Sequence, residues 1–141
     1  MNAIAAKDWI SALKIYSGRV LLAYGFLRKV FEIFELYKIP IDMITTSEVD
    51  VSVTIDDATQ LESIQKELMK YGAVELDADH TIICVVGDFI KNEKGIAADI
   101  LDKLRAIPIR MISYGGSKHN ISFLISTSDK ELALKSLNQL F

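Results

Sequence analysis

The feature of this 141-residue sequence that most constrains its fold is an internal repeat that contains both of its prolines. Residues 39–47 read Ile-Pro-Ile-Asp-Met-Ile-Thr-Thr-Ser, and Ile-Pro-Ile-Arg-Met-Ile-Ser-Tyr follows 68 positions later at residues 107–114. A repeat of long period indicates one structural unit that is built twice. The first copy has Asp42 where the second has Arg110. We therefore expect the first copy to bind a ligand and the second to support it.

The composition argues against several classes of partner. The net charge is −3 and there is no basic run, which disfavours nucleic acid and an anionic membrane surface. The longest apolar stretch is far too short to span a membrane, and residues 1–7 contain no secretory signal. The single cysteine, Cys84, cannot form an internal disulfide, which fits a reducing compartment. We therefore expect a cytoplasmic protein.

Hydrophobic periodicity predicts six elements in the first copy. Apolar residues at a spacing of two indicate strands, and those at a spacing of three to four indicate helices. The alternation across residues 49–55 predicts a strand with one buried face, and Gly72 is expected to cap the second helix. The elements are a strand at 10–17, a helix from Gly25 that Pro40 stops, strands at 41–46 and 49–55, a helix that starts at Asp56-Asp57, and a strand at 73–76. This order is that of the ferredoxin-like split βαβ motif.

The second copy repeats this order but lacks the last strand. Its elements are a strand at 82–86, a helix after Gly95, strands at 109–114 and 121–125, and a final helix that Ser128 or Asp129 caps. The apolar residues 3–6 can fill the sheet edge that is left open. We therefore predict an α+β fold of two ferredoxin-like βαββαβ units, each with an antiparallel sheet and its helices on one face. The first unit, residues 10–77, is inserted in the second, residues 78–141 plus a strand at 3–8.

The sequence offers no catalytic set and no metal site. His80 and Cys84 are four residues apart, which on a strand is about 13 Å and too far for a shared metal ion. Phosphate-binding glycine motifs are absent, and no nucleophile stands near a partner base. We expect no catalytic residue, no metal and no cofactor in this chain.

One group of residues in the first unit could bind an amino acid. Gly25, Phe26 and Leu27 stand at a predicted helix start, where unpaired N–H groups and the helix dipole attract a carboxylate. Asp42 begins a neighbouring strand and could bind an ammonium group, which would place an anion site beside a cation site. A surface aspartate and a glycine at a helix entry explain the same residues equally well.

These residues also resemble a known family. The stretch at 21–32 contains Tyr-Gly-Phe-Leu-Arg-Lys-Val-Phe, and the stretch at 41–49 reads Ile-Asp-Met-Ile-Thr-Thr-Ser-Glu-Val. Both are similar to the paired ACT regulatory domains of aspartate kinase, and residues 109–115 and 119–121 resemble the second domain of that pair. The similarity covers almost the whole chain and is greatest to the lysine-sensitive, monofunctional type of aspartokinase.

The resemblance implies a function and a set of binding residues. Aspartate kinase phosphorylates the β-carboxylate of aspartate with ATP, in a kinase domain that precedes the ACT domains, so this chain would be a regulatory fragment without the ATP site. The effector L-lysine would bind to the first unit near the interface of a homodimer and cause feedback inhibition. The effector-binding positions are Val20, Gly25, Phe26, Leu27, Ile41, Asp42, Thr46, Ser47 and Glu48.

Other functions fit the same residues. The chain could be an ACT module that only dimerises and binds no ligand, or a stand-alone ACT sensor protein. An independent enzyme of ferredoxin-like fold has no catalytic set to support it. The sequence leaves open whether the effector is lysine, threonine or another amino acid.

Overall fold

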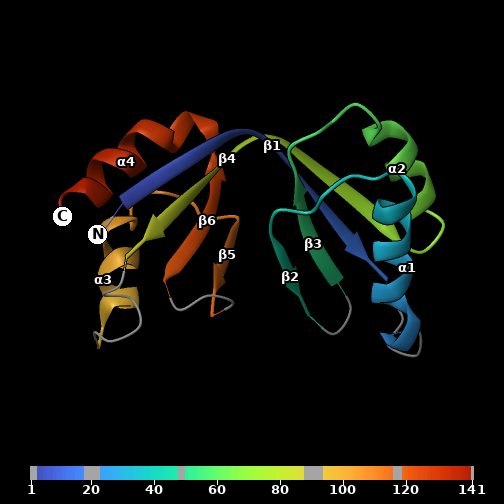
Figure 1. Ribbon diagram of the computed structural model, residues 1–141, viewed down its shortest axis with the longest axis horizontal. Helices are drawn as coiled ribbons and strands as arrows, with labels where there is room; N and C mark the ends of the chain where they lie inside the picture. Colours follow the sequence, from blue (N-terminus) through green and yellow to red (C-terminus); the bar gives the residue numbers. More distant parts are fainter. Residues whose placement is uncertain (1–2, 18–22, 48–49, 88–93, 116–118, 141) are drawn as a thin grey trace. The chain divides into compact units, whose positions relative to one another are not determined.

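The computed structural model describes residues 3–17, 23–47, 50–87, 94–115 and 119–140. The chain divides into two compact units, which we call the first unit, residues 10–78, and the second unit, residues 1–9 with 79–141. The predicted fold class is confirmed, because each unit combines antiparallel strands with two helices on one face (Figure 1).

The first unit has the strand order β2-β3-β1-β4, which is that of a ferredoxin-like sheet. Strands β1 and β3 pair antiparallel from Ser11 opposite Ile55 to Tyr16 opposite Asp50. The short strand β2 pairs with β3 and forms the edge of the sheet. The elements of this unit are β1 (Ala3–Tyr16, from Ile10 on), α1 (Ala23–Leu36), β2 (Ile44–Thr46), β3 (Asp50–Ile55), α2 (Leu61–Leu68) and β4 (Ala73–Val86, up to Ala78).

The second unit has the equivalent order β5-β6-β4-β1. Its fourth strand is the first half of β1, Ala3–Trp9, which belongs to this unit while the rest of β1 belongs to the first. Strands β4 and β6 pair from His80 opposite Ser126 to Val86 opposite Asn120. The further elements are α3 (Ile96–Lys103), β5 (Met111–Tyr114), β6 (Asn120–Ser126), the 3-10 turn η3 (Thr127–Asp129) and α4 (Lys130–Asn138).

Each unit has its own hydrophobic core between its strands and its helices. In the first unit Leu13 and Ile15 of β1 pack with Val30 and Phe34 of α1. In the second unit Ile83 and Val85 of β4 occupy the corresponding place, 70 positions later, and pack with α3 and α4. Burial of apolar surface of this kind is the main favourable term in folding.

The prediction that strand β3 has only one buried face is wrong, because β3 is buried on both faces. Ser52 and Thr54, on the face that the alternation predicts to be exposed, are both buried, as are the apolar residues Val51, Val53 and Ile55. The backbone N–H of Met43 donates to Oγ1 of Thr54 at 2.8 Å, so the buried hydroxyl has a partner. Alternation alone could not reveal this burial, because short hydroxyl side chains suit either environment once they are hydrogen-bonded.

Both ends of α2 differ from the predicted signals. Helix α2 begins at Leu61, and Asp57 instead accepts bonds from the backbone N–H and the hydroxyl of Thr59 in the preceding turn. Gly72 is not a left-handed helix cap, because its φ is not positive and α2 already ends at Leu68. A Cβ atom at Gly72 would lie 2.3 Å from the carbonyl oxygen of Tyr16. Gly72 is therefore required by the close approach of two backbone segments.

Both repeat prolines follow helices, but another residue ends α1. Lys38 has a left-handed backbone with φ of 55°. Its N–H donates to the carbonyl of Glu35 at 3.0 Å, and the N–H of Ile39 donates to that of Phe34 at 3.0 Å. These two bonds form a Schellman motif, in which Lys38 takes the place that glycine usually holds. Pro40 lies just beyond this motif. None of the helices among the described residues is long and apolar enough to cross a membrane.

Candidate functional site

The structure places the predicted binding residues at two ends of the first unit. Gly25, Phe26 and Leu27 lie in the first turns of α1, at the end of the unit where β2 runs into the turn toward β3 (Figure 1). Thr46 and Ser47 lie at that same end. Two further predicted positions, Val20 and Glu48, lie outside the described residues.

The backbone N–H groups of α1 that have no intrahelical acceptor lie slightly earlier than the sequence suggested. Because α1 begins at Ala23, the N–H groups without a helical acceptor end at Gly25, and those of Phe26 and Leu27 fall within the helix. Gly25 is exposed, and no described atom lies within 4 Å of the position of an added Cβ atom. Among the described residues, therefore, none blocks a small anion from the backbone here, where the helix dipole favours it.

Ser47, just after β2, is bonded to Asp50, the first residue of β3, and Asp50 was not among the predicted site residues. Ser47 donates its hydroxyl to Oδ1 of Asp50 at 2.6 Å and its N–H to the carbonyl oxygen of Asp50 at 2.9 Å. Nζ of Lys14 lies 3.9 Å from Oδ2 of the same carboxylate. The hydroxyl proton of Ser47 is thereby used, and its oxygen remains as an acceptor that suits an ammonium group. A serine three residues before an aspartate in a short turn was the available sequence signal.

Asp42 lies at the other end of β2. Its N–H donates to the carbonyl oxygen of Thr54 at 2.9 Å. In the pairing of β1 with β3, Thr54 is opposite Ala12, whereas Asp50 is opposite Tyr16. This difference of four residues corresponds to about 13 Å along the sheet. Within one chain, therefore, the structure does not bring Asp42 together with the start of α1.

Asp42 and Arg110 occupy equivalent places in the two units. The N–H of Arg110 donates to the carbonyl oxygen of Leu124 at 2.8 Å, as that of Asp42 does to Thr54. Each of the two residues is followed by a buried methionine, Met43 or Met111. The repeat thus keeps the backbone at this position and inverts the charge of the side chain.

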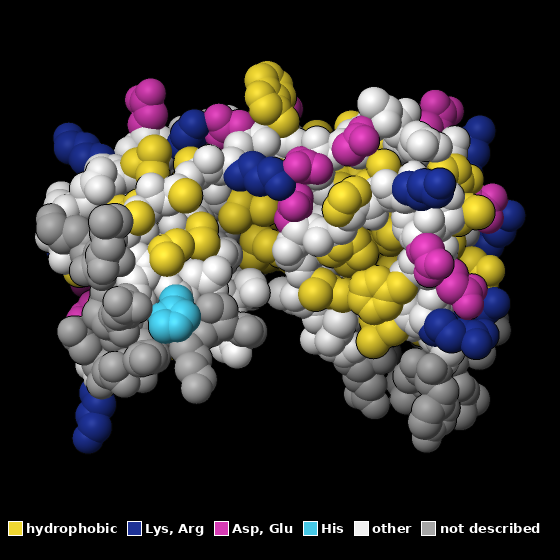
Figure 2. All heavy atoms as spheres, viewed as in Figure 1, with side chains coloured by type: hydrophobic (Ala, Val, Ile, Leu, Met, Phe, Trp, Pro, Cys, Tyr) yellow, Lys and Arg dark blue, Asp and Glu magenta, His cyan; other side chains and the backbone are white. Residues whose placement is uncertain are grey.

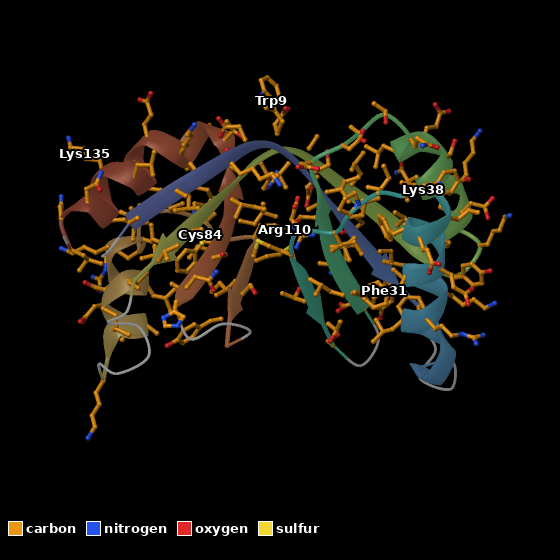
Figure 3. All side chains as sticks on the ribbon, in the orientation of Figure 1. Trp9, Phe31, Lys38, Cys84, Arg110 and Lys135 are labelled. Carbon is orange, nitrogen blue, oxygen red and sulfur yellow. The ribbon has the colours of Figure 1, made fainter. Side chains whose placement is uncertain are left out.

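Apolar side chains are exposed along α1 and β2. Leu27, Phe31 and Ile44 are 37%, 41% and 37% exposed, whereas Ile41 is half-buried and packs against the core of the first unit. Figure 2 shows hydrophobic side chains gathered over this part of the unit, and Figure 3 shows Phe31 extending from α1 on the side of the strands. Exposed apolar groups next to an edge strand are typical of an interface.

The structure gives no support for a metal or catalytic cluster among the residues it describes. No group of three or more His, Cys, Asp or Glu side chains could hold a metal ion in those residues. His80 and Cys84 lie on β4 opposite Ser126 and Ser122.

Comparison of this chain with known proteins shows which family it belongs to. A family model described as ACT domain matches residues 83–141. A solved structure described as a C-terminal regulatory domain of aspartate kinase from Porphyromonas gingivalis W83 is 46% identical, with a TM-score of 0.91 over 99% of this chain and 96% of that one. E. coli aspartokinase III in complex with lysine and aspartate is 32% identical, with a TM-score of 0.85 over 99% of this chain and 33% of that chain.

Curated relatives agree with the solved structures. The aspartokinase of Candida albicans is 38% identical over 97% of this chain and 26% of its own length. The lysine-sensitive aspartokinase 3 of E. coli is 31% identical over 97% of this chain and 32% of its own length. The chain thus spans about a quarter to a third of the curated relatives that it matches.

The fold and these matches show that the chain is built of ACT domains. More particularly, the chain belongs to the C-terminal regulatory domains of the aspartate kinase family. The resemblance noted from residues 21–32 and 41–49 is thereby confirmed.

Proposed function

We propose that this chain binds L-lysine in its first unit and conveys feedback inhibition to the catalytic part of an aspartate kinase. Support comes from the E. coli relative, whose solved structure is described as a complex with lysine and aspartate in the T-state. The binding sites for ATP and aspartate would belong to the rest of the parent protein, and this chain would have no catalytic activity of its own.

The single observation that carries the proposal is the position of Asp42. The carboxylate and ammonium groups of an amino acid are attached to one carbon atom, whereas Asp42 and the start of α1 lie at opposite ends of β2. A second copy of the chain could supply the group that lies too far away within one copy. If two β2 edges pair antiparallel about a twofold axis, Asp42 of one copy lies level with Gly25 and Ser47 of the other.

In this arrangement each group of the effector has a chemically suitable partner. The free N–H groups at the start of α1 hold the carboxylate, and Asp42 of the other copy holds the α-ammonium. Thr46 or Glu48 then holds the side-chain ammonium, and the oxygen of Ser47 accepts from a neighbouring N–H. The exposed Leu27, Phe31 and Ile44 would be covered by the second copy.

Inhibition would follow from differential affinity. Lysine would bind one arrangement of the regulatory units more tightly than another and shift the population toward it. The catalytic part would be inactive in that arrangement, and by linkage its substrates would oppose lysine binding.

Thermal unfolding with lysine, threonine and methionine in turn tests this proposal. An effector at about 100 times its dissociation constant should stabilise the fold by roughly 2.7 kcal/mol. We expect lysine to raise Tm in the wild type and in Arg110→Ala but not in Asp42→Ala, each variant being compared with its own ligand-free Tm. No shift with any amino acid at millimolar concentration would exclude effector binding, and a shift lost only in Arg110→Ala would place it in the second unit.

A second candidate function is a dimerisation module without an effector. The exposed apolar residues of α1 and β2 favour it, because an interface of this kind needs no ligand. Sedimentation with and without lysine distinguishes the two functions. A dimer that forms equally well in both conditions, together with no lysine-dependent Tm shift, would favour the module.

A further inference from the structure

The two halves of β1 are held in different ways. The half in the first unit contains the fully buried Ile10, Leu13 and Ile15. The half in the second unit, Ala3–Trp9, is described throughout and has no fully buried side chain, and only Ile4 packs against that unit's core. It is also the edge strand of its unit. A strand with so little burial opens at a low free energy compared with the rest of a fold.

A polar cluster compensates for the missing burial at the end of this half. Oδ1 of Asp8 accepts the hydroxyl of Thr81 at 2.8 Å, and Oδ2 accepts Nζ of Lys130 at 2.7 Å. Thr81 on β4 is fully buried, and its oxygen lies 3.0 Å from Oγ1 of Thr127. Because the hydroxyl of Thr81 donates to Asp8, Thr127 donates to Thr81. One carboxylate thus ties β1 to β4 and to the start of α4.

The charge state of Asp8 agrees with this geometry. The bonds from Lys130 and Thr81 hold the pKa of the Asp8 carboxyl below its usual value, so it is ionised at neutral pH. Hydrogen bonds to a charged group are about twice as strong as neutral ones. The first unit has no such tie at the equivalent place, because Ala78 lies 70 positions after Asp8.

The residue after this cluster has a strained backbone. Trp9 has φ of 62°, in the left-handed region that bulky residues rarely adopt. Its side chain is 84% exposed and projects away from the ribbon in Figure 3. Burial therefore does not offset the strain, which persists only because the structure on either side imposes it. Trp9 is also where β1 passes from the second unit to the first.

From these observations we propose that Ala3–Asp8 is a releasable strand of the second unit, with the Asp8–Thr81–Lys130 cluster as its latch and Trp9 as its pivot. Release breaks both bonds of Asp8, withdraws the carboxylate from Lys130 and leaves the edge of β4 unpaired. The first unit keeps its own half of β1, which its core holds in place. Release of this strand therefore changes the contacts of Lys130 at the start of α4. It involves none of the residues of the proposed effector site.

Hydrogen exchange measured by mass spectrometry on the whole chain tests the latch. Lys130→Met removes one partner of Asp8, and Lys135→Met is the matched control on the same helix, where the lysine is exposed. We expect exchange over residues 3–9 to be about tenfold faster in Lys130→Met, as loss of a charge-assisted bond implies. Exchange over residues 50–55 should stay unchanged, and Lys135→Met should resemble the wild type.

Equal acceleration in both units, or none over residues 3–9, would overturn the proposal. Trp9→Gly gives a second test that does not depend on the fold surviving loss of Lys130. Glycine relieves the left-handed strain of the latched state, so exchange over residues 3–9 should be slower than in the wild type. Unchanged or faster exchange in Trp9→Gly would contradict the assignment of the pivot.

Discussion

At the scale of single residues, Gly25 and Gly72 of the first unit have opposite roles. Gly72 lies against the carbonyl oxygen of Tyr16, where a Cβ atom would approach to 2.3 Å. Gly25 is exposed at the start of α1, with no described atom near its missing Cβ. The same residue type therefore serves packing in one place and access to backbone N–H groups in the other.

These roles predict different effects of the same substitution. Gly72→Ala should lower the free energy of unfolding by about 2–3 kcal/mol, because the backbone of β1 must move to admit the methyl group. Gly25→Ala should leave it unchanged or raise it slightly, since alanine is a better helix former, but should weaken lysine binding. Urea unfolding and calorimetric titration measure the two quantities. Equal loss of stability in both variants would refute this distinction.

Sequence reasoning located both glycines but assigned Gly72 the wrong role. A glycine after a helical pattern usually ends the helix in the left-handed region, and the approach of Tyr16 is a tertiary contact that no local pattern records. Asp50 was missed for a related reason, because the sequence does not show that its carboxylate is tied to both Ser47 and Lys14.

At the scale of elements, helix α1 is ended by a local backbone motif and not by the proline that follows it. The helix ends at Leu36, four residues before Pro40, because Lys38 adopts the left-handed conformation and closes a Schellman motif. Ile39 and Phe34, which flank the motif, are both buried and supply the hydrophobic contact that usually accompanies it. Lys38 is labelled in Figure 3.

Glycine at position 38 should therefore stabilise the first unit. A non-glycine residue in the left-handed region costs about 1 kcal/mol, so Lys38→Gly should raise the free energy of unfolding by about 0.5–1 kcal/mol. Lys66→Gly, within α2, is the control and should lower it by about 1 kcal/mol. Urea denaturation of both variants gives the comparison, and a loss of stability in Lys38→Gly would show that the lysine side chain matters more than the backbone.

The periodic elements were predictable because their patterns are long. The helices and the strands around residues 10–15, 50–55 and 121–125 lie where the periodicity placed them. The burial of Ser52 and Thr54 was not predictable, because it depends on partners such as the N–H of Met43 that come from another strand. The strand predicted at 41–46 is shortened to the three residues of β2, Ile44–Thr46, and Ile41, Asp42 and Met43 precede it.

At the scale of the whole molecule, the repeat explains both the fold and its asymmetry. Two units of one design share the long strands β1 and β4, and each strand contributes one half to each unit. The charge inversion between Asp42 and Arg110 occurs on matched backbone positions. The sequence alone led us to propose one site that contains both Asp42 and the start of α1, but it does not show that these lie about 13 Å apart along the sheet, because that follows from the register of the strands.

The central claim is that one effector site is shared by the first units of two copies, and mixed dimers test it most directly. Asp42→Ala removes the proposed ammonium partner, and Gly25→Val obstructs the proposed carboxylate position, so neither variant alone should bind lysine. Refolding the two together at equal concentration should produce mixed dimers in which one site is intact, restoring lysine binding to about a quarter of the wild-type sites. If the wild type binds lysine and the refolded mixture does not, the site lies within a single copy and the account is contradicted.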